Sequence, residues 1–193
     1  MPLKPRKYQQ KRRAAHQDET RRRIVEATVD LHTTLGPART SILAIAERAG
    51  VERPTVYRHF PTNDALLTAC SSHHWELYPP PDPEPWVAIA DPEVRLRTAL
   101  GALYDHYADH ELAQWSILRD AEDVPDIRRF GTRTVQYRAR VVNVLADGAR
   151  NASKRHRAAL GHAIDFFAWR SLHRQGLSNA EAAELMVGLV RNA

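Results

Sequence analysis

The sequence is poor in the residues that cross-linked and membrane proteins depend on. It has one cysteine, Cys70, among 193 residues, which excludes a disulfide framework and a metal site built from several thiolates. No apolar run approaches the roughly 18 residues of a membrane-spanning helix, and the charged N-terminus lacks the apolar segment of a secretory signal. We therefore expect a cytoplasmic protein that has no membrane partner.

The sequence also lacks the motifs of common enzyme classes. It has no glycine-rich phosphate loop, no G-x-S-x-G motif and no H-E-x-x-H motif. His106 and His110 are four residues apart, a spacing that allows two histidines on one helix to share a metal. No cysteine or carboxylate set completes such a site, and chance pairs are common among ten histidines. We predict a protein that is not an enzyme and that binds no cofactor and no metal.

Positive charge is concentrated at the N-terminus. The formal net charge is +5, and residues 1–23 hold nine Lys/Arg against Asp18 and Glu19, which leaves the rest of the chain slightly acidic. A basic arm of this kind suits a polyanion such as DNA, although it could also be a solvated tail that aids solubility. Residues 1–17 show no hydrophobic periodicity, and we expect them to be disordered without a ligand.

Residues 40–60, TSILAIAERAGVERPTVYRHF, predict two short helices joined by a tight turn. Ser41 can cap the first helix and Gly50 can end it. Pro54 fits the first turn of the second helix, because its missing N–H would have no partner there. The buried face of the first helix has the spacing i, i+3, i+4, i+7 and consists of Ile42, Ile45, Ala46 and Ala49.

The second of these helices is short and unusually polar. Val56 and Phe60 form its buried side, which leaves an exposed polar set of Arg53, Thr55, Tyr57, Arg58 and His59. The major groove of DNA admits one helix and offers base acceptors to arginine, while phosphate oxygens accept from hydroxyl groups. We interpret this helix as one that reads a major groove.

The remaining sequence predicts helices only, about nine in the whole chain. The proline-rich stretch 79–85, PPPDPEP, predicts a stiff extended connector. Thr20 and Thr62 are expected N-caps, and Ser178 with Glu181 forms a capping box. The other helices are expected over residues 21–35, 63–78, from Asp91 onward, over 112–121, 125–150 and 153–175, and after Ser178.

Several short motifs fall within residues 20–70. They are T-R-x-x-I at 20–24, Gly36, T-S at 40–41, I-A-x-x-A-G-V at 45–51, P-T-V-Y-R-H-F at 54–60 and A-L-L at 65–67. With these residues the segment resembles the DNA-binding domain of the tetracycline-repressor (TetR) family of bacterial regulators. Residues 90–193 resemble the divergent ligand-binding and dimerisation region of the same regulators.

The resemblance implies contacts for individual residues. Positions at the start of the second helix contact phosphate in the family, and the first two positions of the recognition helix read bases. Later positions of that helix contact the DNA backbone. Carried onto this chain, the predicted DNA-binding residues are Thr40, Ser41, Arg53, Pro54, Thr55, Tyr57, Arg58 and His59.

One position departs from the family pattern. The family usually has a phosphate-binding lysine at the start of the fourth helix, where this chain has Asn63 followed by Asp64. We expect that contact to be lost or weakened. Our hypothesis is that the basic arm compensates for it.

The resemblance also implies the architecture. We expect an all-α protein with a disordered basic arm at 1–17, a three-helix helix-turn-helix DNA-binding domain at 18–62, and a ligand-binding and dimerisation bundle at 63–193. The last two helices are expected to form a homodimer, because residues 153–175 are apolar over more than one stripe. The candidate ligand-binding residues are Trp75, Tyr104, Tyr107, Trp115 and Phe166, although aromatic residues at helical spacing are commonly core residues.

These predictions describe a ligand-responsive DNA-binding regulator. In this reading a repressor leaves its palindromic operator when a small apolar or aromatic molecule binds the C-terminal bundle. Two alternatives remain open: a DNA-binding accessory protein without ligand control, and an all-helical enzyme. Only the histidines support the enzyme.

Overall fold

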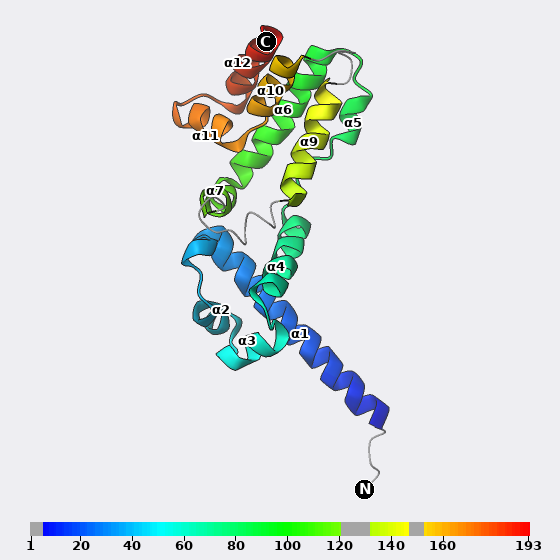
Figure 1. Ribbon diagram of the computed structural model, residues 1–193, viewed down its shortest axis with the longest axis vertical. Helices are drawn as coiled ribbons and strands as arrows, with labels where there is room; N and C mark the ends of the chain where they lie inside the picture. The colour runs from blue at the N-terminus through cyan, green and yellow to red at the C-terminus, as the bar shows by residue number, and fades with distance from the viewer. Residues whose placement is uncertain (1–5, 121–131, 147–152) are drawn as a thin grey trace. The chain divides into compact units, whose positions relative to one another are not determined.

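The computed structural model describes residues 6–120, 132–146 and 153–193, and all regular structure in these ranges is helical (Figure 1). This confirms the predicted all-α class. The described ranges hold 11 α-helices rather than about nine, together with the short 3₁₀ helix η1, Pro37–Arg39. The α-helices are α1 Arg6–Thr34, α2 Ile42–Ala49, α3 Arg53–His59, α4 Asn63–Leu77, α5 Glu84–Val87, α6 Pro92–Asp109, α7 Glu111–Asp120, α9 Thr132–Ala146, α10 Lys154–Ala163, α11 Phe166–Arg174 and α12 Asn179–Arg191.

The chain divides into two compact units. The first comprises residues 1–78 and 115–130, and the second comprises residues 79–114 and 131–193. Helix α4 therefore belongs to the first unit, whereas we placed residues 63–78 in the C-terminal domain. The reason is packing: Leu66 of α4 is buried in the same apolar cluster as Ile24 of α1 and Val56 of α3. Burial of each such side chain contributes about 1.5–3 kcal/mol.

Helix α1 begins at Arg6, so the expected disorder of residues 1–17 is wrong for residues 6–17. Residues 1–5 lie outside the described ranges. Thr20 does not cap the helix as predicted; it lies within it, and its hydroxyl donates to the His16 carbonyl at 2.9 Å. Lys, Arg, Gln and Ala residues have high helix propensity and carry the helix through this region.

Most of the predicted helix ends are confirmed by their capping contacts. The Ser41 and Thr62 hydroxyls accept from the N–H groups three residues later, at 3.1 and 3.2 Å. Asp91 caps α6, and Ser178 forms the capping box of α12 with Glu181. Each such cap contributes about 1 kcal/mol.

In the second unit, two predicted elements are wrong. Residues 153–175 form α10 and α11 rather than one helix, because the Asp165 carboxylate accepts from Phe167 N–H at 2.9 Å and starts a new helix. The proline-rich connector contains the short helix α5, which Pro85 tolerates in its first turn and which buries Trp86. Parts of the predicted helix 125–150 fall outside the described ranges.

The described helices include none that is both long and apolar enough to cross a membrane.

A buried histidine in the first unit makes stability depend on pH. His32 is 8% exposed, and its Nδ1 lies 3.5 Å from the Cys70 sulfur. Burial lowers the pKa of His32 to about 4; Asp120 opposes this shift and His74 adds to it. Burial also raises the pKa of Cys70 to about 12, so the thiol stays protonated. His32 is therefore neutral in the folded protein at neutral pH.

The sign of the effect follows from the ordinary histidine pKa of about 6.5 in the unfolded chain. Below that pH the unfolded chain binds a proton that the folded chain does not, so the free energy of unfolding falls. We expect a loss of about 2 kcal/mol from His32 between about pH 6.5 and about pH 5. Urea titrations of the wild type and His32→Gln should show a smaller pH dependence in the variant, and equal dependences would contradict the expectation.

Candidate nucleic-acid interface

The turn between α2 and α3 begins at Gly50, which ends α2. Gly50 has φ 62°, in the left-handed region that glycine adopts without a Cβ penalty. The N–H of Val51 donates to the Ala46 carbonyl at 3.0 Å, which closes the end of α2. This turn sets the direction in which α3 leaves, and it was predicted from the sequence.

Two arginines of α1 hold this turn and the far end of α3. The Arg23 guanidinium donates to the carbonyls of Ala49 and, at 3.0 Å, of Gly50. Arg21 donates to the His59 carbonyl at 3.2 Å, and its guanidinium lies 4.2 Å from the Phe60 ring centroid. Arginine at helix ends satisfies carbonyls that have no partner in the helix. Helix α1 thus holds the end of α2 with the turn that follows it and the last residue of α3.

Sequence reasoning missed these roles. In the sequence Arg21 and Arg23 count only as charges of the basic arm, whereas in the structure both donate to backbone carbonyls at the ends of α2 and α3. Their partners lie 26 to 38 residues away in the chain, so local spacing carries no signal for the contacts.

On the exposed side of α3, Arg53 and Tyr57 form a pair. Arg53 Nη2 donates a hydrogen bond to the Tyr57 hydroxyl at 3.2 Å. The guanidinium of Arg53 lies 5.6 Å from the centroid of the Tyr57 ring. The contact orients Arg53 and leaves the Tyr57 O–H able to donate elsewhere. Pro54 and Arg58 are also exposed, whereas Thr55 is half-buried. The DNA-contacting roles of these residues stay predictions.

His59 differs from its neighbours in charge. It is half-buried, and burial lowers its pKa, with further lowering by Arg58 and Arg21. The ring is therefore neutral at neutral pH and offers one N–H donor rather than a full charge. A backbone contact from His59 would be a single hydrogen bond.

The two predicted phosphate ligands ahead of α2 are not equivalent. Thr40 donates its hydroxyl to the Gly36 carbonyl at 2.9 Å and its N–H to the Pro37 carbonyl at 3.2 Å. Phosphate oxygens need donors, and both donors of Thr40 are used inside the loop. Ser41 accepts from Ala44 N–H, which leaves its hydroxyl hydrogen for a phosphate. Of the two, Ser41 is better suited to the contact.

The loop before α2 is held by a buried carboxylate. Asp120 is 5% exposed, accepts from Ala38 N–H at 2.9 Å and pairs with Arg119 Nε at 2.7 Å. Arg119 also donates to the Leu35 carbonyl at 3.0 Å. Burial alone would raise the pKa of Asp120, but the bonds from Arg119 and Ala38 N–H outweigh it and the pKa is lowered. We name Asp120 and Arg119 the loop clamp.

Gly36 lets the loop approach the clamp. Its φ is 98°, and a Cβ at this position would collide with the side chains of Arg119 and Asp120 and lie 3.0 Å from the Ser116 carbonyl. In the sequence Gly36 is recognisable only as part of a motif, and the loop clamp leaves no local signal because Asp120 is 82 residues away from Ala38.

The ligand-binding candidates separate between the two units. In the second unit, Tyr107 and Phe166 meet edge to face with centroids 5.5 Å apart, and both lie beside the fully buried Trp169. The hydroxyls of Tyr104 and Tyr107 donate to the carbonyls of Ala163 and Ile164 at 2.7 and 2.8 Å. We call Tyr104, Tyr107, Phe166 and Trp169 the aromatic cluster. Trp75 and Trp115 belong to the first unit.

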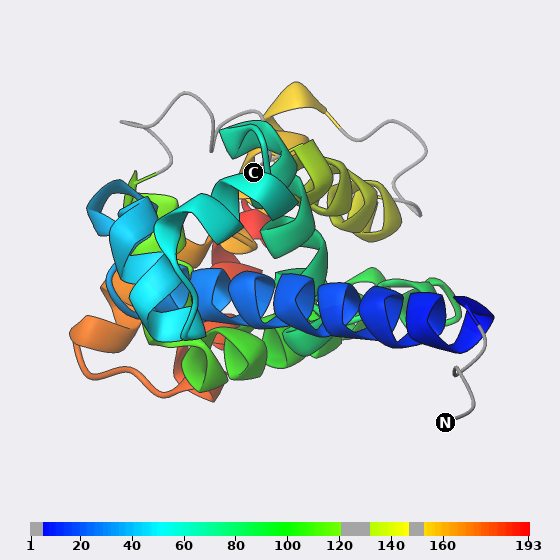
Figure 2. The same ribbon diagram turned by 90° about the horizontal axis from the view of Figure 1, so that it is seen from below.

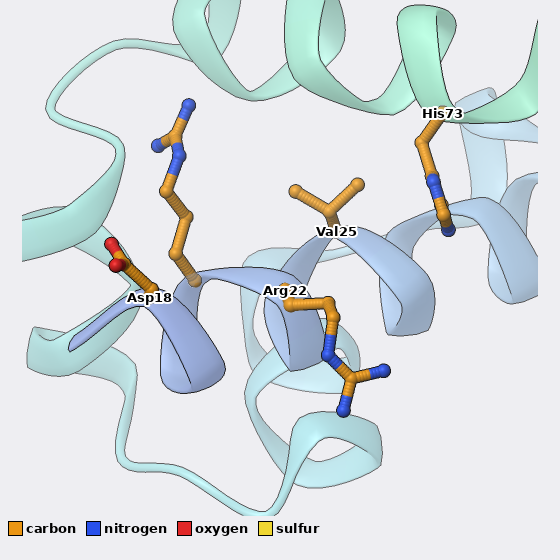
Figure 3. Close-up of a pocket in the computed structure, with 5 residues that line it drawn as sticks. Asp18, Arg22, Val25 and His73 are labelled. Carbon is orange, nitrogen blue, oxygen red and sulfur yellow. The ribbon is translucent and has the colours of Figure 1, made fainter. Parts of the chain in front are cut away.

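An open hollow of about 260 Å³ lies in the first unit between α1 and α4 (Figure 3). It is lined by Asp18, Arg21, Arg22, Val25 and His73. Arg22 pairs with Glu19 at 2.7 Å, and Arg21 is used at the end of α3. The hollow is smaller than typical ligand pockets, and none of the candidate ligand-binding residues lines it.

The histidine pair is placed as its spacing predicted. The rings of His106 and His110 have centroids 4.8 Å apart, and burial lowers the pKa of His106 to about 4. Its Nε2 lies 3.4 Å from the Gln114 amide nitrogen. Among the described residues, no group of three or more potential ligands is placed to hold a metal ion.

Comparison with known proteins finds sequence similarity over part of the chain and structural similarity over most of it. Residues 24–70 match the family model for bacterial regulatory proteins of the tetR family. The HTH-type transcriptional repressor Rv3405c of Mycobacterium tuberculosis and the regulator Mb3439c of Mycobacterium bovis are each 43% identical to this chain over 56 residues. The match covers 29% of this chain and 30% of each relative.

Solved structures are similar over most of the chain. A TetR-like transcriptional regulator from Rhodococcus sp. RHA1 has 23% identity and a TM-score of 0.60, covering 89% of this chain and 93% of that one. A tetR-family regulator from Streptomyces coelicolor has 19% identity and a TM-score of 0.58, covering 91% and 78%. At these identities the likeness shows the fold.

Proposed function

Because this chain belongs to the tetR family of bacterial regulatory proteins, we propose that it is a ligand-responsive repressor of transcription that binds a palindromic DNA operator. The observation that carries the proposal is the exposed pair of Arg53 and Tyr57 on α3, a helix whose last residue is held by Arg21 of α1 and whose preceding turn is held by Arg23. A short helix fixed in this way can present the same side chains to DNA without first becoming ordered.

In the proposed complex, Arg53 donates two hydrogen bonds to O6 and N7 of a guanine in the major groove. Tyr57, Thr55 and Ser41 donate to phosphate oxygens, which fixes the register and orientation of the helix without reading sequence. The hydrogen bond between Arg53 and Tyr57 supports these two roles, because Tyr57 orients the guanidinium of Arg53.

We propose that two copies associate through α11 and α12. Leu185 and Leu189 of α12 are 48% and 52% exposed and lie four residues apart, on one side of the helix. Phe167 of α11 is also exposed. Exposed apolar side chains at helical spacing suit a self-complementary interface, and a two-fold axis requires an operator with two-fold symmetry.

The effector we propose is a small apolar or aromatic molecule that contacts Tyr104, Tyr107 and Phe166. Both tyrosine hydroxyls bind carbonyls at the break between α10 and α11. A molecule that displaces the Tyr107 hydroxyl would move α11, and with it part of the proposed dimer interface. The ligand would bind the protein with α11 moved more tightly than the protein with α11 in place. The free energy of DNA binding could then change by at most the difference between these two free energies of ligand binding.

A screen of small aromatic and apolar molecules by thermal shift tests the proposal. The DNA would be a duplex of about 30 base pairs chosen by the full chain from a random library, which we call the selected duplex. We expect a ligand that adds about 2.7 kcal/mol of stability at 100 times its Kd and releases the selected duplex.

The other outcomes separate the alternatives. A chain that binds the selected duplex and keeps it in the presence of every bound molecule would be a DNA-binding accessory protein. Turnover of a small molecule without DNA affinity would indicate an enzyme. Either result would overturn the proposal.

A further inference from the structure

We propose that Leu43 of α2 is a second specificity-determining residue, which contacts the methyl group of a thymine in the major groove. The inference rests on the proposed DNA binding and adds an apolar contact to the polar contacts of α3. It gives α2 a part in reading bases, whereas the family resemblance led us to expect phosphate contacts at its start.

Leu43 is a large apolar side chain that the core of its unit leaves exposed. It lies in the first turn of α2 and is 55% exposed, whereas Ile45, Ala46 and Ala49 form the buried face of the same helix. Across residues 42–59, all of which the structure describes, the other exposed large apolar side chain is Tyr57 of α3. Single exposed leucines are common on protein surfaces, so the place of Leu43 decides what it can contact.

Around the helix axis, Leu43 lies on the α3 side of α2. Arg48 is five positions after Leu43, which places the two about 140° apart, with the buried residues of α2 in the wider arc between them. Arg48 pairs with Asp30, so its edge of the buried face borders α1. Helix α2 packs against both α1 and α3, which lie beside it in both views (Figures 1 and 2). The edge that Leu43 borders is therefore the one next to α3.

Along the helix axis, Leu43 lies at the end of α2 that faces the proposed phosphate contact. Ser41 is the N-cap of α2 and keeps its hydroxyl hydrogen for a phosphate. Leu43 is two residues further along the chain, about 3 Å along the axis. The Cα–Cβ bonds of a helix tilt toward its N-terminus, so the side chain of Leu43 leans toward Ser41. A phosphate bound by Ser41 would bring the edge of the groove within reach of Leu43.

The chemistry of the side chain selects the group that it contacts. Leucine has no hydrogen-bond donor for a phosphate or a base acceptor. The thymine methyl is the apolar group that base edges present in the major groove, and contact with it removes apolar surface of both partners from water. Cytosine presents an amino donor in the same groove and has no methyl. Each half-site would then contain a guanine read by Arg53 and a thymine read by Leu43.

The test removes the methyl group from the DNA and the leucine from the protein. Deoxyuridine pairs with adenine as thymidine does but lacks the methyl, and it would replace the thymines of the selected duplex one position at a time, in both half-sites together. At one position the wild type should lose affinity about 4-fold for each half-site, or roughly 15-fold for the duplex, the factor for one buried methyl-sized group per half-site.

Leu43→Ala should bind the thymine and deoxyuridine duplexes with equal affinity at that position. Alanine has the highest helix propensity, and Leu43 is outside the core, so the variant should keep the fold. The matched control is Leu77→Ala at the far end of α4, which removes a leucine of the same unit that is 51% exposed. The control should keep the sensitivity of the wild type to the methyl.

Three results would overturn the inference. They are a wild type that tolerates deoxyuridine at every position, a Leu43→Ala variant that keeps the same sensitivity as the wild type, and an equal loss of sensitivity in Leu77→Ala. A wild type that binds no DNA would instead contradict the proposed function, so the two failures are distinguishable.

Discussion

Replacing Arg53 with alanine is expected to abolish discrimination at one base pair of each half-site while leaving nonspecific DNA binding nearly unchanged. The guanidinium is exposed on α3 and oriented by the Tyr57 hydroxyl 3.2 Å away. A bidentate contact to guanine contributes about 1–3 kcal/mol of discrimination, or roughly 5- to 150-fold in affinity. Titrations against the selected duplex, its single-base variants and a scrambled duplex measure the effect.

Arg53→Lys is the matched control for charge. Lysine keeps the positive charge but cannot reproduce the planar fork that binds two acceptors, so we expect it to lose most of the discrimination. It should retain the salt dependence of the wild type, which reports phosphate contacts. If Arg53→Ala weakened binding equally on the selected and the scrambled duplex, Arg53 would be a phosphate contact and not a base reader.

Replacing Asp120 with alanine is expected to be the most destabilising of the substitutions considered. The change leaves Ala38 N–H without its acceptor and Arg119 without its carboxylate, at a site that is 5% exposed. The ion pair is partly exposed through Arg119, so most of the expected cost comes from leaving the Ala38 N–H without an acceptor, which costs about 1–3 kcal/mol. Urea unfolding gives the change in the free energy of unfolding.

An ion pair on the surface provides a control for the effect of Asp120→Ala. Asp30 and Arg48 also form an ion pair in the first unit, but both side chains are about half exposed. Asp30→Ala should therefore cost less than about 1 kcal/mol. Equal losses in Asp120→Ala and Asp30→Ala would show that the loop clamp is not a buried pair in solution.

The loop clamp also bears on DNA binding. Asp120 holds Ala38, and Ala38 leads through Thr40 to Ser41 at the start of α2. Asp120→Asn keeps the size of the side chain and an oxygen that can accept from Ala38 N–H, so it should lose less stability than Asp120→Ala. A variant that stays folded but binds the selected duplex more weakly would link the clamp to the placement of Ser41.

Local features of the fold could be predicted from the sequence because they depend on neighbours a few residues apart. The caps at Ser41 and Ser178 and the left-handed Gly50 follow from residue type and spacing, and they are confirmed. The break at Asp165 follows the same capping chemistry, but the apolar run around it was read as one continuous helix.

Features that depend on distant partners could not be predicted. Thr20 resembles an N-cap in sequence, yet helix-favouring residues on both sides carry α1 through it. Arg23 and Asp120 hold backbone groups that lie 26 and 82 residues away, and neither spacing nor composition identifies such partners. The exposed side of α3 was recognised because a six- or seven-residue polar helix has little reason to form except for a partner.

Selection of bound sequences from the random duplex library, with the wild type and Arg53→Ala in parallel, tests the central claim that α3 reads DNA most directly. The wild type should enrich a two-fold symmetric sequence whose half-sites lie about 10 base pairs apart or a related spacing, each with a guanine that the variant no longer requires. A wild-type chain that enriched no sequence, or a variant that enriched the same sequence with the same guanine, would contradict it.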